Sequence, residues 1–468
     1  MAPRRIRPQP ALWRHTPKAR WKDTAKPAET IDVRAPAGPW SGMAFRFVHT
    51  ADLHLDSPLR SLALRNGELA EHVRGATRAA LTAIVDLCIA EAVDALLIAG
   101  DLYDGSQTSM NTALFLMGEM RRLEMAGVRV FVIRGNHDNQ SAIRRELTFP
   151  DNVHVFSNRT KSVKAATLPD GRAVYIHGIG FDQPHAPDSL LPSFPGPQSD
   201  SVNIGMLHTS LAGAPGHDLY APTSVAELAA HGFDYWALGH VHHRLVHSET
   251  PLIVMPGMPQ GRDINEAGAK SVTLVTIEAG GQIHHDERRI GSAVFERATV
   301  DLTGVSEWRA LLARIGDDLA RRVAAAGAQH LILRLHLMGA TPLAFRLKRD
   351  PAFLADEVTG LANALPGCWV EKIEIDCQAP DLGTTAGAET GLDPAAELSA
   401  LIHGDVLGSH GFRQQAADLM TELLGQLPRE LRETFGTDEA AVEALLVEIA
   451  RDGSDEVLAH VRAGEGDL

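Results

Sequence analysis

Between residues 52 and 242 the chain carries several short clusters of side chains of the types that bind divalent metal ions. They combine carboxylate, imidazole and amide groups, which suit hard to borderline cations. In an extended segment, residues i and i+2 point to the same side, so an Asp-x-His or His-x-His pair can reach one ion. The clusters are Asp52-Leu53-His54, Asp101, Asn136-His137-Asp138, His208 and His240-Val241-His242.

These clusters together supply enough ligands for two metal ions. Asp101 is suited to bridge them, because a carboxylate has two oxygens and two-metal sites hold their cations ~3.5–4 Å apart. Such a pair of ions lowers the pKa of a bound water and clamps a phosphoryl group for in-line attack, which predicts phosphoester hydrolysis. One ion would take Asp52, His54 and His242 as further ligands, and the other would take Asn136, His208 and His240.

His137 follows a predicted ligand, and we expect it to act on the substrate rather than on the metal. An imidazole placed there can stabilise the charge of the transition state or protonate the leaving oxygen, a role worth ~10²–10⁴-fold in rate. The neighbouring Asp138 could orient that imidazole, as outer carboxylates do around metal sites. Each residue alone could be structural, but their recurrence at successive strand ends argues against that interpretation.

The elements that must position these residues are predicted strands and helices in alternation. An apolar strand begins at Phe45 and runs into Asp52, and helices at 67–92 and 108–125 separate it from strands at 94–99 and 128–133. This alternation indicates a parallel sheet with right-handed crossovers, and ligands bind such sheets at the carboxyl ends of the strands. Further strands are predicted at 153–156, 173–179, 202–207 and 234–238, and antiparallel strands at 252–255, 271–277 and 282–289 complete the domain.

Composition sets limits on the class of protein. At 468 residues, with 44% hydrophobic and 22% charged residues, the chain is long enough for two or three globular domains. Its three cysteines lack ligand spacing, which indicates a reducing compartment, and we expect the cytoplasm. No apolar run approaches the roughly 20 residues of a membrane span. The net charge of −15 argues against nucleic acid as a partner, although bound cations would invert that argument locally.

The charge is uneven along the chain, and this unevenness helps to divide the chain into five segments. Residues 1–42 carry nine Lys/Arg and three Asp/Glu, whereas residues 381–468 carry five Arg and eighteen Asp/Glu. We predict a disordered arm or a misassigned start at 1–42, a metal-binding α/β domain at 43–294, a small α+β module at 295–378, a linker at 379–391, and an acidic helical tail at 392–468.

The motifs HTADLHLDSPL, GDLYD, RGNHD, LHTSL and GHVHHR resemble those of the calcineurin-like metallophosphoesterases, and most of all the SbcD/YhaO-type DNA repair exonucleases. The resemblance implies an α/β/β/α sandwich, manganese as the metal, and hydrolysis of DNA phosphodiester bonds. It also implies that the seven predicted ligands bind metal, that His137 is catalytic, and that the module at 295–378 is a capping domain that contacts DNA. The implied partners are an SbcC-like ATPase with a long coiled coil and a second copy of the chain.

Two features depart from that pattern: Arg134 replaces the usual proline before Gly-Asn-His-Asp, and the acidic tail is additional. The tail could dock on a partner ATPase or could be a solvated helical bundle. Arg262 could contact a phosphate or could be an ordinary surface arginine. The main alternative to a nuclease is a phosphatase or small-molecule phosphodiesterase, which the acidic charge favours. A non-catalytic scaffold is a further alternative, and the intact ligand set argues against it.

Overall fold

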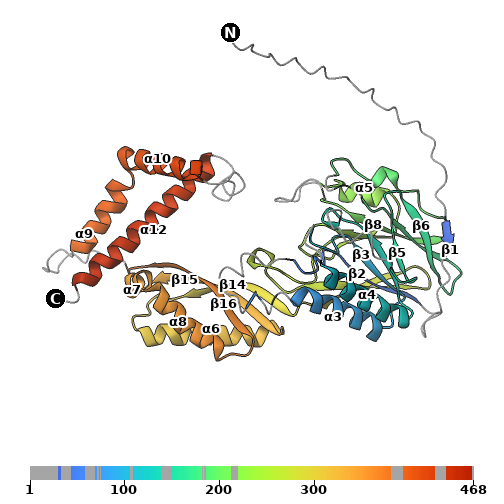
Figure 1. The fold of residues 1–468 in the computed structure, drawn as a ribbon, viewed down its shortest axis with the longest axis horizontal. Helices are drawn as coiled ribbons and strands as arrows, with labels where there is room; N and C mark the ends of the chain where they lie inside the picture. Colours follow the sequence, from blue (N-terminus) through green and yellow to red (C-terminus); the bar gives the residue numbers. More distant parts are fainter. Residues whose placement is uncertain are drawn as a thin grey trace, which may run out of the picture.

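A computed structural model describes residues 30–32, 44–57, 69–70, 73, 75–105, 109–138, 149–181, 183, 186–211, 220–380, 394–426 and 439–465. Figure 1 shows three parts in a row, with a two-sheet domain at one end, a small module in the middle and a group of helices at the other end. Among the residues that it describes, no helix combines the length and the apolar character needed to cross a bilayer.

The first sheet of the large domain has six strands, and its centre is parallel, as the sequence predicts. β2, β3, β4 and β5 run parallel, whereas β12 is antiparallel to β2 and to β13. Their order across the sheet is β13 (Ile283–Arg289), β12 (Ser271–Glu278), β2 (Ala44–Thr50), β3 (Ala95–Ala99), β4 (Arg129–Ile133) and β5 (Val153–Val155).

The second sheet has seven strands and departs from the prediction in three respects. The strand expected to be antiparallel at 252–255 is so on one side only, because β11 is antiparallel to β10 but parallel to β9. The strands β6 and β10 were not predicted from the sequence, and β1 lies inside the arm that was expected to be disordered. The order is β1 (Thr30–Asp32), β6 (Lys161–Thr167), β7 (Ala173–Gly178), β8 (Ser201–His208), β9 (Tyr235–Gly239), β11 (Leu252–Met255) and β10 (Leu245–Glu249).

Other residues of the arm at 1–42 lie outside the described part of the chain, as does most of the predicted linker. Helix α3 (Ala76–Ala90) begins later than predicted, and α4 (Met110–Met125) lies within the predicted range. The Ser109 side chain caps α4 by accepting the backbone N–H of Thr112, which satisfies one of the free donors of the first turn.

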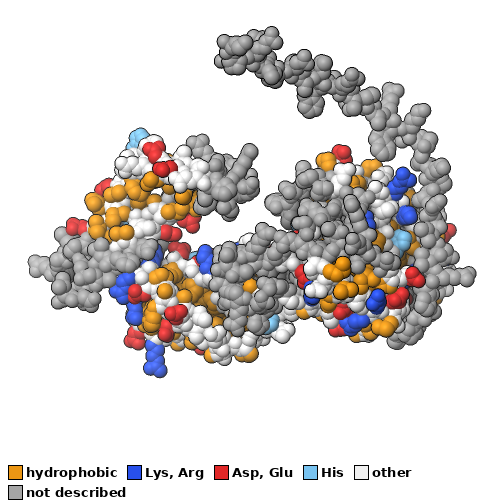
Figure 2. Space-filling model, in the orientation of Figure 1, with side chains coloured by type: hydrophobic (Ala, Val, Ile, Leu, Met, Phe, Trp, Pro, Cys, Tyr) orange, Lys and Arg blue, Asp and Glu red, His pale blue; other side chains and the backbone are white. Residues whose placement is uncertain are grey.

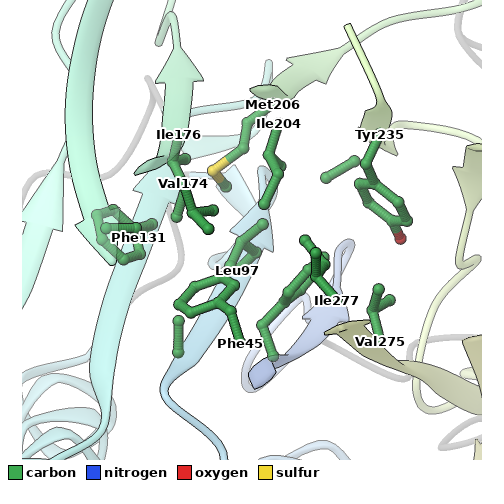
Figure 3. Packing of buried hydrophobic residues seen from close by; sticks show 14 of the residues in the cluster. Phe45, Leu97, Phe131, Val174, Ile176, Ile204, Met206, Tyr235, Val275 and Ile277 are labelled. Carbon is green, nitrogen blue, oxygen red and sulfur yellow. The ribbon is translucent and has the colours of Figure 1, made fainter. Parts of the chain in front are cut away.

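The layers form the expected α/β/β/α sandwich, because each sheet buries both faces. Alternate residues of the two sheets meet in a core that includes Phe45, Leu97, Ile204 and Tyr235 (Figure 3). The other face of the six-stranded sheet packs on α3 and α4, and that of the seven-stranded sheet packs on the short helix α5 (Val225–Ala230). A core buried on both sides fixes the strand ends in space, which is what a site built on them needs.

The middle module alternates strands with helices, and its three strands are parallel in the order β14-β15-β16. This is a βαβ-type arrangement and not the segregated one that the term α+β implies. Its elements are β14 (Ala293–Asp301), α6 (Trp308–Ala326), β15 (His330–Ala340), α7 (Ala344–Arg349), α8 (Pro351–Asn363) and β16 (Cys368–Gln378).

The described part of the tail is helical, and its long helix α12 packs against α7 of the middle module. It consists of α9 (Pro394–Leu401), a π-helical turn (Ile402–Val406), α10 (His410–Gln426) and α12 (Glu439–Glu465). The middle module also contacts the large domain, through an apolar cluster that joins Val73 and Ile264 to Phe295 and Ile332. The chain therefore forms three parts that are packed in sequence order.

Candidate metal centre and active site

The seven predicted metal ligands come together where the carboxyl ends of five strands meet. Six of them follow a strand end within a few residues, and His208 is itself the last residue of β8. One group of possible ligand atoms within 4.8 Å of one another joins Asp52, His54 and His242, and a second joins Asp52, Asp101 and His208. The Oδ1 atom of Asn136 lies 3.1 Å from Nε2 of His208 and 3.3 Å from Nδ1 of His240.

The backbone is strained at the residues that carry these side chains. Asp52, His54, Asp101 and His240 have φ angles of 53°, 42°, 51° and 105°, in the left-handed region that residues with a side chain rarely adopt. Such conformations cost of order 1–3 kcal/mol each and persist where the surroundings over-determine them. Here the Asp52 carboxylate accepts the backbone N–H of His240 at 3.1 and 3.2 Å, which ties the end of β2 to the end of β9.

Gly135 is required because the site is crowded around it. A Cβ atom built at this position would overlap both the carboxylate of Asp101 and the imidazole of His208. The backbone of β4 can therefore approach these two side chains only where the residue has no side chain of its own.

In the first group of ligand atoms, burial shifts the pKa of two residues, His54 and Asp52. Burial lowers the pKa of His54 to about 3, so this imidazole is neutral near pH 7. Burial also raises the pKa of Asp52, to about 6. The Nε2 atoms of His54 and His242 are 3.1 Å apart, and Nδ1 of His54 is buried without a hydrogen-bond partner among the described residues. Two imidazoles that converge in this way fit a shared cation.

In the second group, the tautomer of His208 is fixed by the fold. Its Nδ1–H donates to the carbonyl oxygen of Ala99 at 2.9 Å, which leaves Nε2 facing Asp101 Oδ2 at 3.5 Å. Burial lowers the pKa of His208, but the charge of Asp101 outweighs it and raises the pKa to about 9. A cation would replace this proton, because metal binding and ligand protonation compete. The buried carboxylate, imidazole and amide donors thus fit a pair of divalent cations.

His137 is paired with Asp104 and not with Asp138, so the predicted role of Asp138 in orienting His137 is wrong. Nδ1 of His137 lies 3.1 Å from Oδ1 of Asp104, and this hydrogen bond raises the pKa of His137. Asp138 instead accepts the backbone N–H groups of Gly135 and Tyr103, each at 3.0 Å. Asp104 belongs to the GDLYD motif, so the sequence contained the residue but no spacing that linked it to His137.

Two further residues lie behind the ligands: Glu266, which the sequence analysis did not single out, and Arg262, which it left between a phosphate contact and a surface position. The Glu266 carboxylate lies 2.9 Å from Nδ1 of His242, and Arg262 donates to Glu266 at 2.6 Å. Arg262 is largely buried, so the interpretation as an ordinary surface arginine is wrong. Their spacing of four residues in a loop carries no pattern that points to a site, and only the tertiary contact reveals them.

His49 is close to the site but has a structural role. Its Nε2–H donates to the Leu238 carbonyl oxygen at 3.0 Å, and Nδ1 therefore accepts from the Tyr235 hydroxyl at 2.9 Å. Burial lowers the pKa of His49 to about 3. The ring is a neutral connector between the two sheets.

Comparison with known proteins agrees with this geometry. The family model "Calcineurin-like phosphoesterase" matches residues 45–244, and the model "Metallophosphoesterase YhaO, middle domain" matches residues 295–378. The chain belongs to the calcineurin-like metallophosphoesterases, which are hydrolases that act on phosphoester bonds. Within this family it is similar to the "Uncharacterized metallophosphoesterase YhaO" of Bacillus subtilis, with 34% identity over 276 residues, 59% of this chain and 67% of the relative.

More distant similarities extend beyond YhaO. The "DNA double-strand break repair protein Mre11" of Methanopyrus kandleri is 24% identical over 268 residues, which are 52% of this chain and 56% of that protein. Among solved structures, a dimetal phosphatase from Danio rerio covers 53% of this chain and 98% of its own, with 14% identity and a TM-score of 0.30.

Proposed function

We propose that the protein hydrolyses phosphodiester bonds of DNA and acts as a DNA repair exonuclease. The observation that carries this proposal is the similarity to an Mre11 protein, whose name places it in the repair of DNA double-strand breaks. The assembled site supports it, because the same ligand set and the same histidine serve attack on any phosphodiester.

In this reaction the metal ligands, His137 and Asp104 have separate roles. Two divalent cations, when bound, would supply an activated water and neutralise charge on the phosphoryl group. Asp101 and the other predicted ligands would hold these cations where the strand ends of the two sheets meet. His137, whose pKa is raised by its hydrogen bond to Asp104, donates a proton to the leaving oxygen. Asp104 holds the ring in place through Nδ1 and thereby leaves Nε2 for this transfer.

The place of the middle module supports a large substrate. It is anchored next to the site, because Phe295 of β14 packs with Ile264 in the segment that carries Arg262 and Glu266. Arg297 of β14 also donates to the side chain of Asn265 at 3.2 Å. We therefore propose that residues 295–378 form the capping domain and extend the binding surface beyond the metal site.

The second candidate is a phosphatase or small-molecule phosphodiesterase, and the net charge of −15 favours it. A DNA-binding protein makes phosphate contacts mainly with basic groups. On the nuclease proposal, the cations of the site must offset part of this charge locally.

Digestion of linear duplex DNA should be compared with hydrolysis of bis(p-nitrophenyl) phosphate, both in the presence of Mn²⁺. Asp101→Ala and His137→Ala serve as controls for the metal site and for proton transfer. We expect both activities in the wild type and neither at the wild-type rate in the variants. Hydrolysis of the small ester without digestion of any DNA would refute the nuclease proposal, and digestion by Asp101→Ala at the wild-type rate would reveal a contaminant.

We further propose manganese as the metal, an SbcC-like ATPase and a second copy of the chain as partners, and the cytoplasm as the location. Three buried free cysteines support a reducing compartment. Figure 2 shows hydrophobic side chains over the C-terminal helices. Leu419 and Leu423 of α10 are exposed, and such a face supports docking of the ATPase there. Exposed Met110 and Leu114 on α4 support self-association.

A further inference from the structure

Glu266 determines which nitrogen of His242 faces the metal site. It ends the short 3₁₀ helix Ile264–Glu266, and its Oε1 atom lies 2.9 Å from Nδ1 of His242. An ionised carboxylate only accepts hydrogen bonds, so Nδ1 of His242 must carry the proton. Nε2 then has a free electron pair, and it is this atom that lies 3.1 Å from Nε2 of His54.

Arg262 holds the Glu266 carboxylate in this place. The guanidinium donates to Oε1 at 2.6 Å, and the backbone N–H of Arg262 donates to Oε2 at 2.8 Å. Both oxygens of the carboxylate are therefore engaged by the same residue, and the Glu266 side chain is only 12% exposed. Charge-assisted hydrogen bonds in such a setting are about twice as strong as neutral ones, so the carboxylate has little freedom to turn.

The same guanidinium also faces the partner of His137. Its Nη1 atom lies 3.8 Å from Oδ2 of Asp104 and 3.4 Å from the Ser57 hydroxyl, which itself donates to Asp104 at 2.5 Å. One arginine thus lies between the two carboxylates that orient His242 and His137.

We propose that Glu266 and Arg262 are a positioning pair that prepares His242 for metal binding and links the metal site to the Asp104–His137 pair. Neither residue is itself a metal ligand in this role. Glu266 selects the His242 tautomer, and Arg262 holds the side chains of Glu266 and Asp104 in position. The inference rests on the metal-dependent chemistry of the family, and it holds whether the substrate is DNA or a small ester.

Metal affinity of the full-length protein tests the role of Glu266. Glu266→Gln keeps the size of the side chain but removes the charge that fixes the tautomer and pairs with Arg262. Titration of the metal-free variant with Mn²⁺ in a calorimeter is expected to show about 10- to 100-fold weaker binding than the wild type, the usual effect of losing an outer partner of a ligating histidine. Asp263→Asn is the matched control, since Asp263 caps the same turn through Asn265 and should leave the affinity unchanged.

Arg262→Lys tests the other half of the pair, because lysine keeps the charge but lacks the forked geometry. It is expected to weaken Mn²⁺ binding, and the double variant with Glu266→Gln should bind no more weakly than Glu266→Gln alone, since Arg262 acts on His242 through Glu266. Fully additive losses in the double variant would overturn this link.

Thermal unfolding separates positioning from a general structural role. On the proposal, metal-free Glu266→Gln unfolds close to the wild-type temperature, and its Mn²⁺-induced rise in Tm is smaller. A fall in the metal-free Tm with an unchanged Mn²⁺-induced rise would show that Glu266 only stabilises the fold. Wild-type Mn²⁺ affinity in Glu266→Gln would likewise overturn the proposal.

Discussion

Replacing Asp104 by asparagine is expected to slow the reaction and to move the alkaline limb of its pH profile to lower pH. His137 must be protonated to donate a proton, so activity falls as the pH rises through its pKa. The hydrogen bond to Asp104 raises that pKa. Asparagine keeps an acceptor oxygen but removes the charge, so the pKa of His137 returns toward its ordinary value and the limb follows it downward.

The size of the effect follows from what the variant retains. A general acid contributes ~10²–10⁴-fold to the rate, and His137→Ala should lose all of this. Asp104→Asn keeps the imidazole and a neutral acceptor for its Nδ1–H, which lies 3.1 Å from the carboxylate in the wild type. We expect a loss of about 10- to 100-fold in kcat, which corresponds to about 1.4–2.7 kcal/mol.

Asp138→Asn makes the same chemical change one residue from His137 and serves as the matched control. Asp138 accepts two backbone N–H groups, from Gly135 and Tyr103. The amide of asparagine can accept only one of them, so one buried donor loses its partner, at a cost of about 1–3 kcal/mol in stability. We expect a lower Tm with the alkaline limb unchanged, measured with bis(p-nitrophenyl) phosphate. A limb that moves in Asp138→Asn and stays fixed in Asp104→Asn would refute the assignment.

Three further outcomes are expected. Gly135→Ala should lose bound metal, measured as metal content after dialysis, because the added methyl group overlaps Asp101 and His208; wild-type metal content would contradict this. Burial lowers the pKa of His49 to about 3, so on acidification this residue is protonated in the unfolded state before it is protonated in the native state. The free energy of unfolding should therefore fall by about 2 kcal/mol between pH 7 and pH 5. Urea unfolding of His49→Gln, which can keep both hydrogen bonds, should show a smaller fall, and an identical fall would contradict the argument. Chelation should lower the Tm, because an ion at 100 times its Kd stabilises the native state by about 2.7 kcal/mol; an unchanged Tm would argue against bound cations.

Much of the fold could be predicted because buried strands have a strong local signature. The runs ending at Thr50, Ala99 and Ile133 are rich in apolar residues, and the helices α3 and α4 separate them, so a parallel sheet follows from their order. β6, with sequence Lys-Ser-Val-Lys-Ala-Ala-Thr, has too few apolar residues to stand out. Its place is set by pairing with β7, which is a tertiary contact that no short window of sequence contains.

In the candidate site, too, one set of residues could be predicted from the sequence and another could not. Its predicted ligands were recognisable because chemistry restricts a metal ligand to a few residue types, and these stood at strand ends. The partners of those ligands were not recognisable, since any nearby carboxylate can orient an imidazole. Asp138 was the obvious choice for His137 because it is the next residue, yet its side chain turns to the backbone of its own loop. Asp104 and Glu266 reach their histidines only after the strands are in place.

The site also depends on contact between the two sheets. Asp52 and Asp101 extend from the six-stranded sheet, whereas His208, His240 and His242 extend from the seven-stranded one. The strained φ angles of Asp52 and His240 are held by a hydrogen bond that crosses from one sheet to the other. A change in the packing of the apolar core between the sheets would therefore separate the two halves of the ligand set. For this reason, core substitutions far from the metals should weaken metal binding more than their loss of stability alone explains.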